Sequence, residues 1–138
     1  MGITSFSIDW YNCGLCCGDS IVHEKTTLHH RKREISIKQY NGMNTMLIET
    51  RCKVPKEDIE GFFLMLEQMD AENSWQSDYR VMVCDGWSWT VRIRYSNGTV
   101  KRVEGTVDLP PNGNKITKKI RNMLGKTFCI VEPQLFGR

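Results

Sequence analysis

The sequence has no long run of apolar residues. Its first ten residues, Met1 to Trp10, contain neither a basic segment nor a continuous apolar stretch, which argues against a signal peptide and a membrane anchor. Position 6 is Phe, whereas myristoylation of Gly2 requires Ser or Thr there. We therefore expect a cytoplasmic protein, and because that compartment is reducing, we expect its six cysteines to be free thiols.

Recognisable catalytic motifs are also missing. The chain has no Gly-rich phosphate loop, no His-Glu-x-x-His motif and no nucleophile elbow, and its three histidines lack a neighbouring Ser or Cys in a strand-turn-helix context. An active site assembled in space from distant residues stays open, because such a site leaves no local pattern. We expect a protein that is not an enzyme and that uses no cofactor.

Charge is modest overall but unevenly distributed. The 138 residues carry a net charge of +3, and a composition with 40% hydrophobic and 25% charged residues predicts one globular domain spanning 1–138. Between Val54 and Asp78 there are seven acids and one base, whereas between Lys115 and Lys126 there are five bases and no acid. This segregation either steers association with a partner or reflects two solvated helix faces.

The strongest local pattern is the alternation of apolar and polar side chains from Trp87 to Tyr95, which predicts a strand with one buried face. The following Ser96-Asn97-Gly98 predicts a three-residue hairpin loop, because Gly adopts a positive φ without strain. This loop length places Trp89 opposite Gly105, so that the indole covers a residue without a side chain. The same register pairs Val91 with Val103 and Trp87 with Val107.

Weaker patterns predict the remaining elements. Alternation over 3–11 predicts a strand, and Tyr40-Asn41-Gly42 predicts a second hairpin with a three-residue loop. That loop would set Ile35 against Leu47 and Arg33 against Glu49. Apolar residues at helical spacing predict two helices, over 55–70 and 116–125. Short strands are expected over 79–84 and 128–131, and 20–30 is ambiguous.

These elements predict an α+β fold, with an antiparallel sheet of about five to six strands and two helices packed on one face. The order of strand, Asn-Gly turn, strand, Pro and helix occurs twice, and both the Asn-Gly turns (41 and 97) and the prolines (55 and 111) recur at a spacing of 56 residues. The recurrence is consistent with a degenerate ββα duplication, and equally with chance reuse of a common turn dipeptide.

Cys13, Cys16 and Cys17 form a compact cluster of reactive side chains. A Cys-x-x-Cys pair is half of a zinc site, but tetrahedral zinc needs four ligands. The histidines that could complete the shell are His23, His29 and His30. The cluster is therefore a zinc site, a redox-sensing or metal-sensing thiol pair, or a loop of unliganded cysteines, and we expect the last. The other three, Cys52, Cys84 and Cys129, are interpreted as small core residues.

Several short motifs together resemble an uncharacterised group of small bacterial proteins. In chain order they are Cys13-Gly14-Leu15-Cys16, the acidic first turn of the 55–70 helix, Asp85-Gly86-Trp87-Ser88-Trp89, Asn97-Gly98, Gly105 and Pro110-Pro111-Asn112. The pattern spans most of residues 5–124, and Cys17 and the basic stretch at 29–33 depart from it. The resemblance implies an antiparallel sheet with helices and implies no activity.

Exposed basic side chains indicate a binding function. They lie on the polar face of the 87–107 hairpin and on the second helix, where the candidates are Arg92, Arg94, Arg102, Lys118 and Arg121. We expect a non-enzymatic binding or inhibitory module that recognises an acidic surface of another protein and has no membrane partner. The alternatives are a metal-binding or thiol-based regulatory protein that uses the cysteine cluster with His23, and a protein that binds the backbone of nucleic acids.

Overall fold

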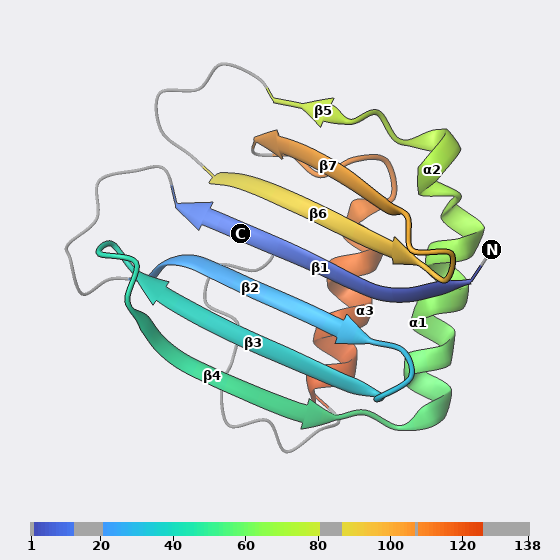
Figure 1. Ribbon diagram of the computed structural model, residues 1–138, viewed down its shortest axis with the longest axis horizontal. Coiled ribbons are helices and arrows are strands. Elements are labelled where there is room, and N and C mark those ends of the chain that lie inside the picture. The colour runs from blue at the N-terminus through green and yellow to red at the C-terminus, as the bar shows by residue number, and fades with distance from the viewer. Residues whose placement is uncertain (1, 13–20, 81–86, 107, 126–138) are drawn as a thin grey trace.

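The computed structural model shows one seven-stranded sheet with helices packed on one of its faces (Figure 1). The structure describes residues 2–12, 21–80, 87–106 and 108–125. The strands lie in the order β4-β3-β2-β1-β6-β7-β5, and neighbours are antiparallel except for β5, which runs parallel to β7. The bounds are β1 (Ile3–Asn12), β2 (Ile21–His29), β3 (Glu34–Asn41), β4 (Met46–Lys53), β5 (Asp78–Tyr79), β6 (Trp87–Tyr95) and β7 (Val100–Thr106).

The α+β class is confirmed, but the sheet is larger than the expected five to six strands. The additional regular strand is β2, which pairs with β1 over residues 23–29 and with β3 from Ile21 to His29. Its pattern is hard to recognise in the sequence because its core-facing positions include two polar residues, Glu24 and Thr26, both 0% exposed. Gln39 on β3 donates a hydrogen bond of 2.7 Å to Glu24, which partly satisfies the buried carboxyl group.

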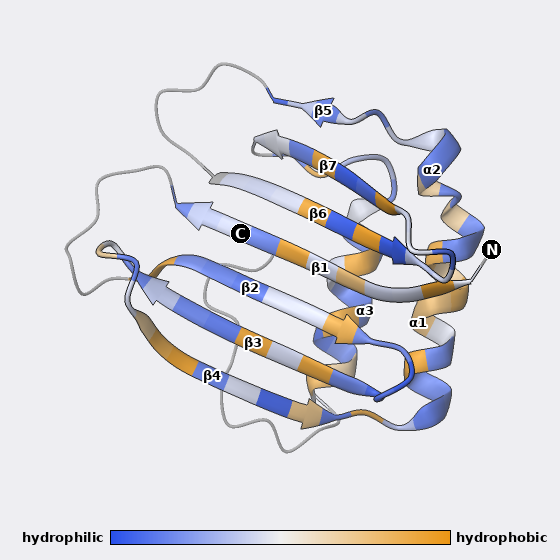
Figure 2. Cartoon of the chain, viewed as in Figure 1, coloured by the Kyte–Doolittle hydropathy of each residue, from blue (hydrophilic) through white to orange (hydrophobic). Residues whose placement is uncertain are grey.

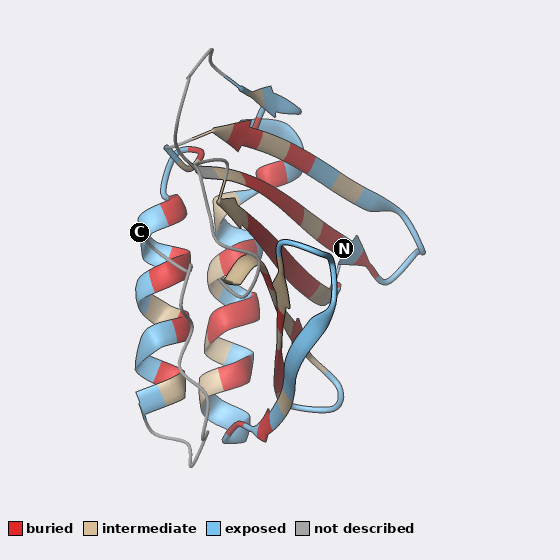
Figure 3. Cartoon of the chain, turned by 90° about the vertical axis from the view of Figure 1, so that its left-hand side faces the viewer, coloured by how far each residue is buried: buried red, intermediate tan, exposed pale blue. Residues whose placement is uncertain are grey.

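Two long helices form the second layer, α1 (Lys56–Met69) and α3 (Gly113–Gly125), and a short α2 (Ala71–Ser74) follows α1 (Figure 3). Pro55 caps the start of α1 with φ of −55°, and the acids Glu57 and Asp58 lie in its first turn, where the helix dipole favours negative charge. Asp70 ends α1 in the left-handed conformation, with φ of 50°. The expected helices are thus present, and α2 was not predicted.

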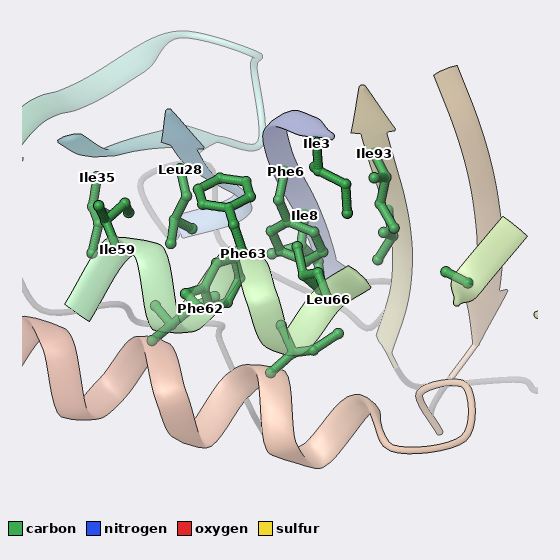
Figure 4. Close-up of a cluster of buried hydrophobic side chains, with 14 of the residues drawn as sticks. Ile3, Phe6, Ile8, Leu28, Ile35, Ile59, Phe62, Phe63, Leu66 and Ile93 are labelled. Atoms are coloured by element: carbon green, nitrogen blue, oxygen red, sulfur yellow. The ribbon is translucent and has the colours of Figure 1, made fainter. Parts of the chain in front are cut away.

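The core lies between the sheet and the helices (Figure 4). Phe62 and Phe63 of α1 are almost fully buried, and the ring of Phe62 meets Phe6 of β1 edge to face, with centroids 5.5 Å apart. Burial of one such side chain stabilises a fold by about 1.5–3 kcal/mol. The face of the sheet that carries Phe6, Ile8 and Trp10 is therefore fixed towards the helices, and the alternate side chains of β1 are directed away from them.

The β6–β7 hairpin has the predicted register. Trp89 pairs with Gly105 and Val91 with Val103, and Trp89 is only 1% exposed. The loop contains three residues, because the backbone N–H groups of Tyr95 and Gly98 bond to the carbonyls of Thr99 and Tyr95, and Gly98 has φ of 89°. The pairing of Trp87 with Val107 lies outside the described residues.

The β3–β4 hairpin contradicts the predicted register. Ile35 pairs with Cys52 rather than Leu47, and Glu34 pairs with Lys53. The loop has three residues as predicted, but it lies two residues further along the chain, at 42–44, because the backbone N–H groups of Asn41 and Asn44 bond to the carbonyls of Thr45 and Asn41. The side-chain oxygen of Asn41 accepts hydrogen bonds of 2.9 Å from the backbone N–H groups of Met43 and Thr45, and a register shift between Gln39 and Tyr40 moves the pairing by one further residue. Arg33 lies in the β2–β3 turn with φ of 53°, and it does not pair with Glu49.

Cys52 is buried as expected but is not a free thiol, because it forms a disulfide bond. The other five cysteines lie outside the described residues. A disulfide is typical of an oxidising compartment, so this bond contradicts the expectation that all six cysteines are reduced.

The two predicted hairpins, β3–β4 and β6–β7, lie on opposite sides of the β1–β2 pair. The segment 128–131, for which a strand was predicted, lies outside the described residues. Within the ranges that the structure describes, no helix has the length and apolar character needed to cross a membrane.

Candidate functional site

The helices cover one face of the sheet and leave the other uncovered by any described helix. Figure 1 is viewed onto this second face, which we call the open face. Cross-strand pairing places a row of polar residues on this face, running across the sheet through Asp9 of β1. From β3 to β7 the row consists of Lys38, Lys25, Asp9, Thr90 and Glu104. Figure 2 shows hydrophilic and hydrophobic residues following one another along β3 and β6, as expected for strands with one polar and one apolar face.

Asp9 is the most deeply buried charged side chain of the open face, with a side-chain exposure of 4%. Its Oδ1 lies 2.7 Å from Nε2 of His23, and its Oδ2 accepts a hydrogen bond of 2.9 Å from Nη1 of Arg92. His23 belongs to β2 and Arg92 to β6, the two strands that flank β1. A buried carboxylate is tolerated only when it is paired, and here one carboxylate fixes a side chain on each neighbouring strand.

His23 is also held by two aromatic rings. It lies between Tyr11 and Tyr40, with ring centroids 4.3 and 4.8 Å away and interplanar angles of 15° and 16°. The registers explain the stack, because Tyr11, His23 and Tyr40 are direct cross-strand neighbours on β1, β2 and β3. Burial, followed by the nearby charge of Asp9, raises the pKa of Tyr11 above its ordinary value of 10.0, so this hydroxyl stays protonated at neutral pH.

Other charges surround this network on the open face. On strands β1 to β4, β6 and β7, alternation from the registers places seven Lys or Arg residues and four Asp or Glu residues on this face. The basic residues are Lys25, Lys38, Arg51, Lys53, Arg92, Arg94 and Arg102, and the acidic residues are Asp9, Glu34, Glu49 and Glu104. Several are paired, as in Arg102 Nη2 to Glu104 Oε1 at 2.6 Å and Lys53 Nζ to Glu34 Oε2 at 3.0 Å. The face is therefore basic on balance but mixed in sign.

The structure brings together three of the five basic residues predicted to bind a partner. Arg92 and Arg102 are direct cross-strand neighbours, and Arg94 follows Arg92 on the same face of β6. Lys118 and Arg121 are exposed on α3, in the helix layer on the other side of the sheet (Figure 3). One flat partner surface cannot cover both groups, so the five residues form two separate basic regions.

The sequence pattern missed the Asp9 network. Alternation over 3–11 sets Asp9 opposite the apolar side of the predicted strand, but the pattern of the segment 20–30, which contains His23, is ambiguous. Arg92 lies 83 residues from Asp9 in the chain, and their contact depends on the pairing of β1 with β6. An Asp and a Tyr alternating with core residues on a central strand is the signal that could have identified this face.

Among the candidate metal ligands, only the histidines lie in the described part of the chain. Cys13, Cys16 and Cys17 lie outside the described residues, and elsewhere in the structure no group of three or more His, Cys, Asp or Glu residues is arranged to hold a metal ion. His23 is bonded to Asp9 through Nε2. His30 bonds through Nδ1 to the carbonyl of Ile3 and stacks on Phe63, with ring centroids 4.6 Å apart.

A cleft of about 570 Å³ lies at the start of α1 and belongs to neither of these features. Its lining includes three basic residues, Arg31, Arg33 and Lys56, together with Glu60. The basic stretch at 29–33 therefore contributes mainly to this separate cleft, and its first residue, His29 at the end of β2, lies on the open face. No protein-family model matches the sequence, and no curated protein matches it either.

Proposed function

We propose that the protein is a non-enzymatic binding module that docks on an acidic surface of another protein through its open face. The observation that carries this proposal is the fixation of Arg92 and His23 by the buried carboxylate of Asp9. An Arg side chain held in one orientation loses little conformational entropy when it binds, which makes it an effective anchor.

Arg92 retains donors for a partner. Its guanidinium has five N–H groups, of which Nη1 bonds to Asp9, and its side chain is 39% exposed. Tyr11 and Tyr40 lie at the same end of the face as His23, and Tyr and Arg are the residue types that most often dominate binding energy in protein interfaces. The site thus combines a positioned cation with rigid aromatic rings.

The mixed charge favours a protein partner over a nucleic acid. Phosphate backbones are uniformly negative, and a surface that binds them gains from every added Lys or Arg and loses from every acid. Glu34, Glu49 and Glu104 interrupt the basic residues of the open face. A partner protein that carries carboxylates opposite the arginines and a few cations opposite these acids would match the pattern.

The test compares two triple variants with the same change in net charge. R92Q/R94Q/R102Q removes three cations from the open face, and K115Q/K118Q/R121Q removes three exposed cations from α3. A partner is captured from nuclease-treated extract of the source cell with the wild-type chain, is purified, and its dissociation constant is measured with all three proteins.

We expect the open-face variant to weaken this complex at least about tenfold, and the helix variant to leave it nearly unchanged, since each lost charge contact with a carboxylate contributes of the order of 1 kcal/mol. Equal affinity of the wild type and the open-face variant would refute the proposal. Capture that succeeds only from untreated extract, and fails after nuclease treatment, would favour the nucleic-acid alternative instead.

A further inference from the structure

Among the described strands, β4 forms one edge of the sheet, and exposed apolar side chains gather on it. Of the six large hydrophobic side chains that are exposed in the described parts of the chain, four lie in the β3–β4 turn and the first half of β4: Met43, Met46, Leu47 and Ile48. Their exposures run from 41% to 80%. Figure 2 shows apolar residues in the first half of β4, and Figure 3 shows this part of the strand as exposed, in contrast to the buried strands beside it.

Such an edge is unusual for an isolated protein. A long edge strand offers unpaired backbone donors and acceptors, and proteins usually protect it with charged residues, proline or a very short strand. β4 is eight residues long and contains no proline, and its first three residues carry no charge. The opposite edge is protected in the usual way, because β5 contains only two residues.

We propose that β4 pairs with β4 of a second copy of this chain, antiparallel about a twofold axis that passes through Thr50. The charge pattern of the strand supports this occupant and this register. With Thr50 opposite Thr50, Glu49 of each copy lies opposite Arg51 of the other, so that two opposite-charge pairs form across the axis.

Ile48 agrees with the same register. It lies opposite Cys52 on the helix side, and both are apolar, while the charged pairs lie on the side of the open face, where Leu47 is opposite Lys53. If the twofold axis passed through residue 49 or residue 51 instead of Thr50, Glu49 would lie opposite Glu49 or Arg51 opposite Arg51. Both arrangements place like charges together and are repulsive. The charge pattern therefore selects one register among its neighbours.

The pairing has a defined structural consequence. The twofold axis runs perpendicular to the sheet, because paired residues of the two copies share a face, so the two sheets join into one continuous sheet with both helix layers on the same side. The open faces of the two copies then form one surface. This inference does not depend on the proposed function, since dimerisation is measured without any partner.

The first test uses charge exchange, with mass measured by light scattering during gel filtration. The wild type should elute with twice the 16.0 kDa mass of one chain. E49R and R51E each place like charges opposite each other, so each variant alone should raise the dimer dissociation constant about tenfold or more. A mixture of E49R with R51E, and the double variant E49R/R51E, should both restore the dimer, because opposite charges face each other again.

The second test fixes the register. Thr50→Cys places two sulfur-bearing residues directly opposite each other across the axis, with Cβ atoms about 4.5–5.5 Å apart, close enough for an intermolecular disulfide under mild oxidation. Leu47→Cys is the matched control on the same strand, because its two copies would lie about 20 Å apart. The wild type, which keeps its own six cysteines, gives the background.

Covalent dimer with Thr50→Cys above that background, and none with Leu47→Cys, would support the inference. A wild type that remains monomeric at its highest soluble concentration would overturn it. So would a dimer that E49R and R51E leave intact, or a mixture of the two variants that stays monomeric although each chain is folded by circular dichroism.

Discussion

The indole of Trp89 lies directly over Gly105, the residue opposite it on β7. A Cβ atom built on Gly105 would overlap the six-membered ring of Trp89 and would lie only 2.7 Å from its Cε2. The indole N–H also donates a hydrogen bond of 3.1 Å to the carbonyl of Asp108. The side chain thus fills the space left by the glycine and ties the β6–β7 hairpin to the segment that leads to α3.

Gly105→Ala should therefore destabilise the protein by about 1–3 kcal/mol, because the methyl group forces the indole or the backbone to move. Chemical denaturation followed by tryptophan fluorescence measures the free energy of unfolding. Gly125→Ala is the control, since a Cβ there meets no atom within 4 Å. Equal stability of Gly105→Ala and the wild type would show that the indole is not packed on this glycine.

Asp9→Asn should destabilise the protein by about 1–3 kcal/mol, even though the two side chains have nearly the same shape. The Asn side chain has one acceptor oxygen where the carboxylate offers two, so it cannot accept from both His23 and Arg92. Thermal unfolding followed by circular dichroism measures the loss. Asp78→Asn is the control, because Asp78 is half exposed and its ion pair with Arg80 lies in solvent.

The pH dependence of stability should reveal the burial of Tyr11. Because the pKa of Tyr11 in the folded protein is raised above 10.0, the folded state binds this proton more tightly than the unfolded state does. The corresponding stability is fully present below pH 10 and is lost as the pH rises through the higher folded value. Tyr11→Phe should lose less stability between pH 9 and 11 than the wild type does, as measured by urea unfolding.

The disulfide of Cys52 predicts a definite peptide map. Digestion without reducing agent, after free thiols are blocked, should yield the peptide of Cys52 joined to a second cysteine-containing peptide, and reduction should separate the two. Recovery of Cys52 only in the blocked form, from protein purified under oxidising conditions, would contradict the bond.

Local chemistry determined which hairpin could be predicted. Gly98 fits the positive φ of a three-residue loop, so the register of β6 and β7 follows from the turn residues alone. The same reasoning placed the loop of the β3–β4 hairpin two residues too early, because the side chain of Asn41 accepts hydrogen bonds from the backbone N–H groups of Met43 and Thr45 and so fixes a three-residue loop after Asn41. In that hairpin, Asn44 adopts the positive φ of 61°.

The candidate site could be predicted only in part, for a different physical reason. Arg92, Arg94 and Arg102 come from one hairpin, so alternation alone placed them on one face. Asp9 lies on β1 and His23 on β2, and the pairing of β1 with β2 and with β6 is a long-range property of the sheet. The separation of Lys118 and Arg121 from the arginines likewise follows from the packing of α3 against the helix-covered face, which periodicity does not encode.

The measurement that tests the central claim most directly is a lysine footprint of the complex with the captured partner. Acetylation rates are compared with and without the partner at Lys25 and Lys38 on the open face and at Lys115 and Lys118 on α3. Our account predicts that the partner slows acetylation of Lys25 and Lys38 and leaves the α3 lysines unchanged. Protection of the α3 lysines, with Lys25 and Lys38 as reactive as in the free protein, would contradict it.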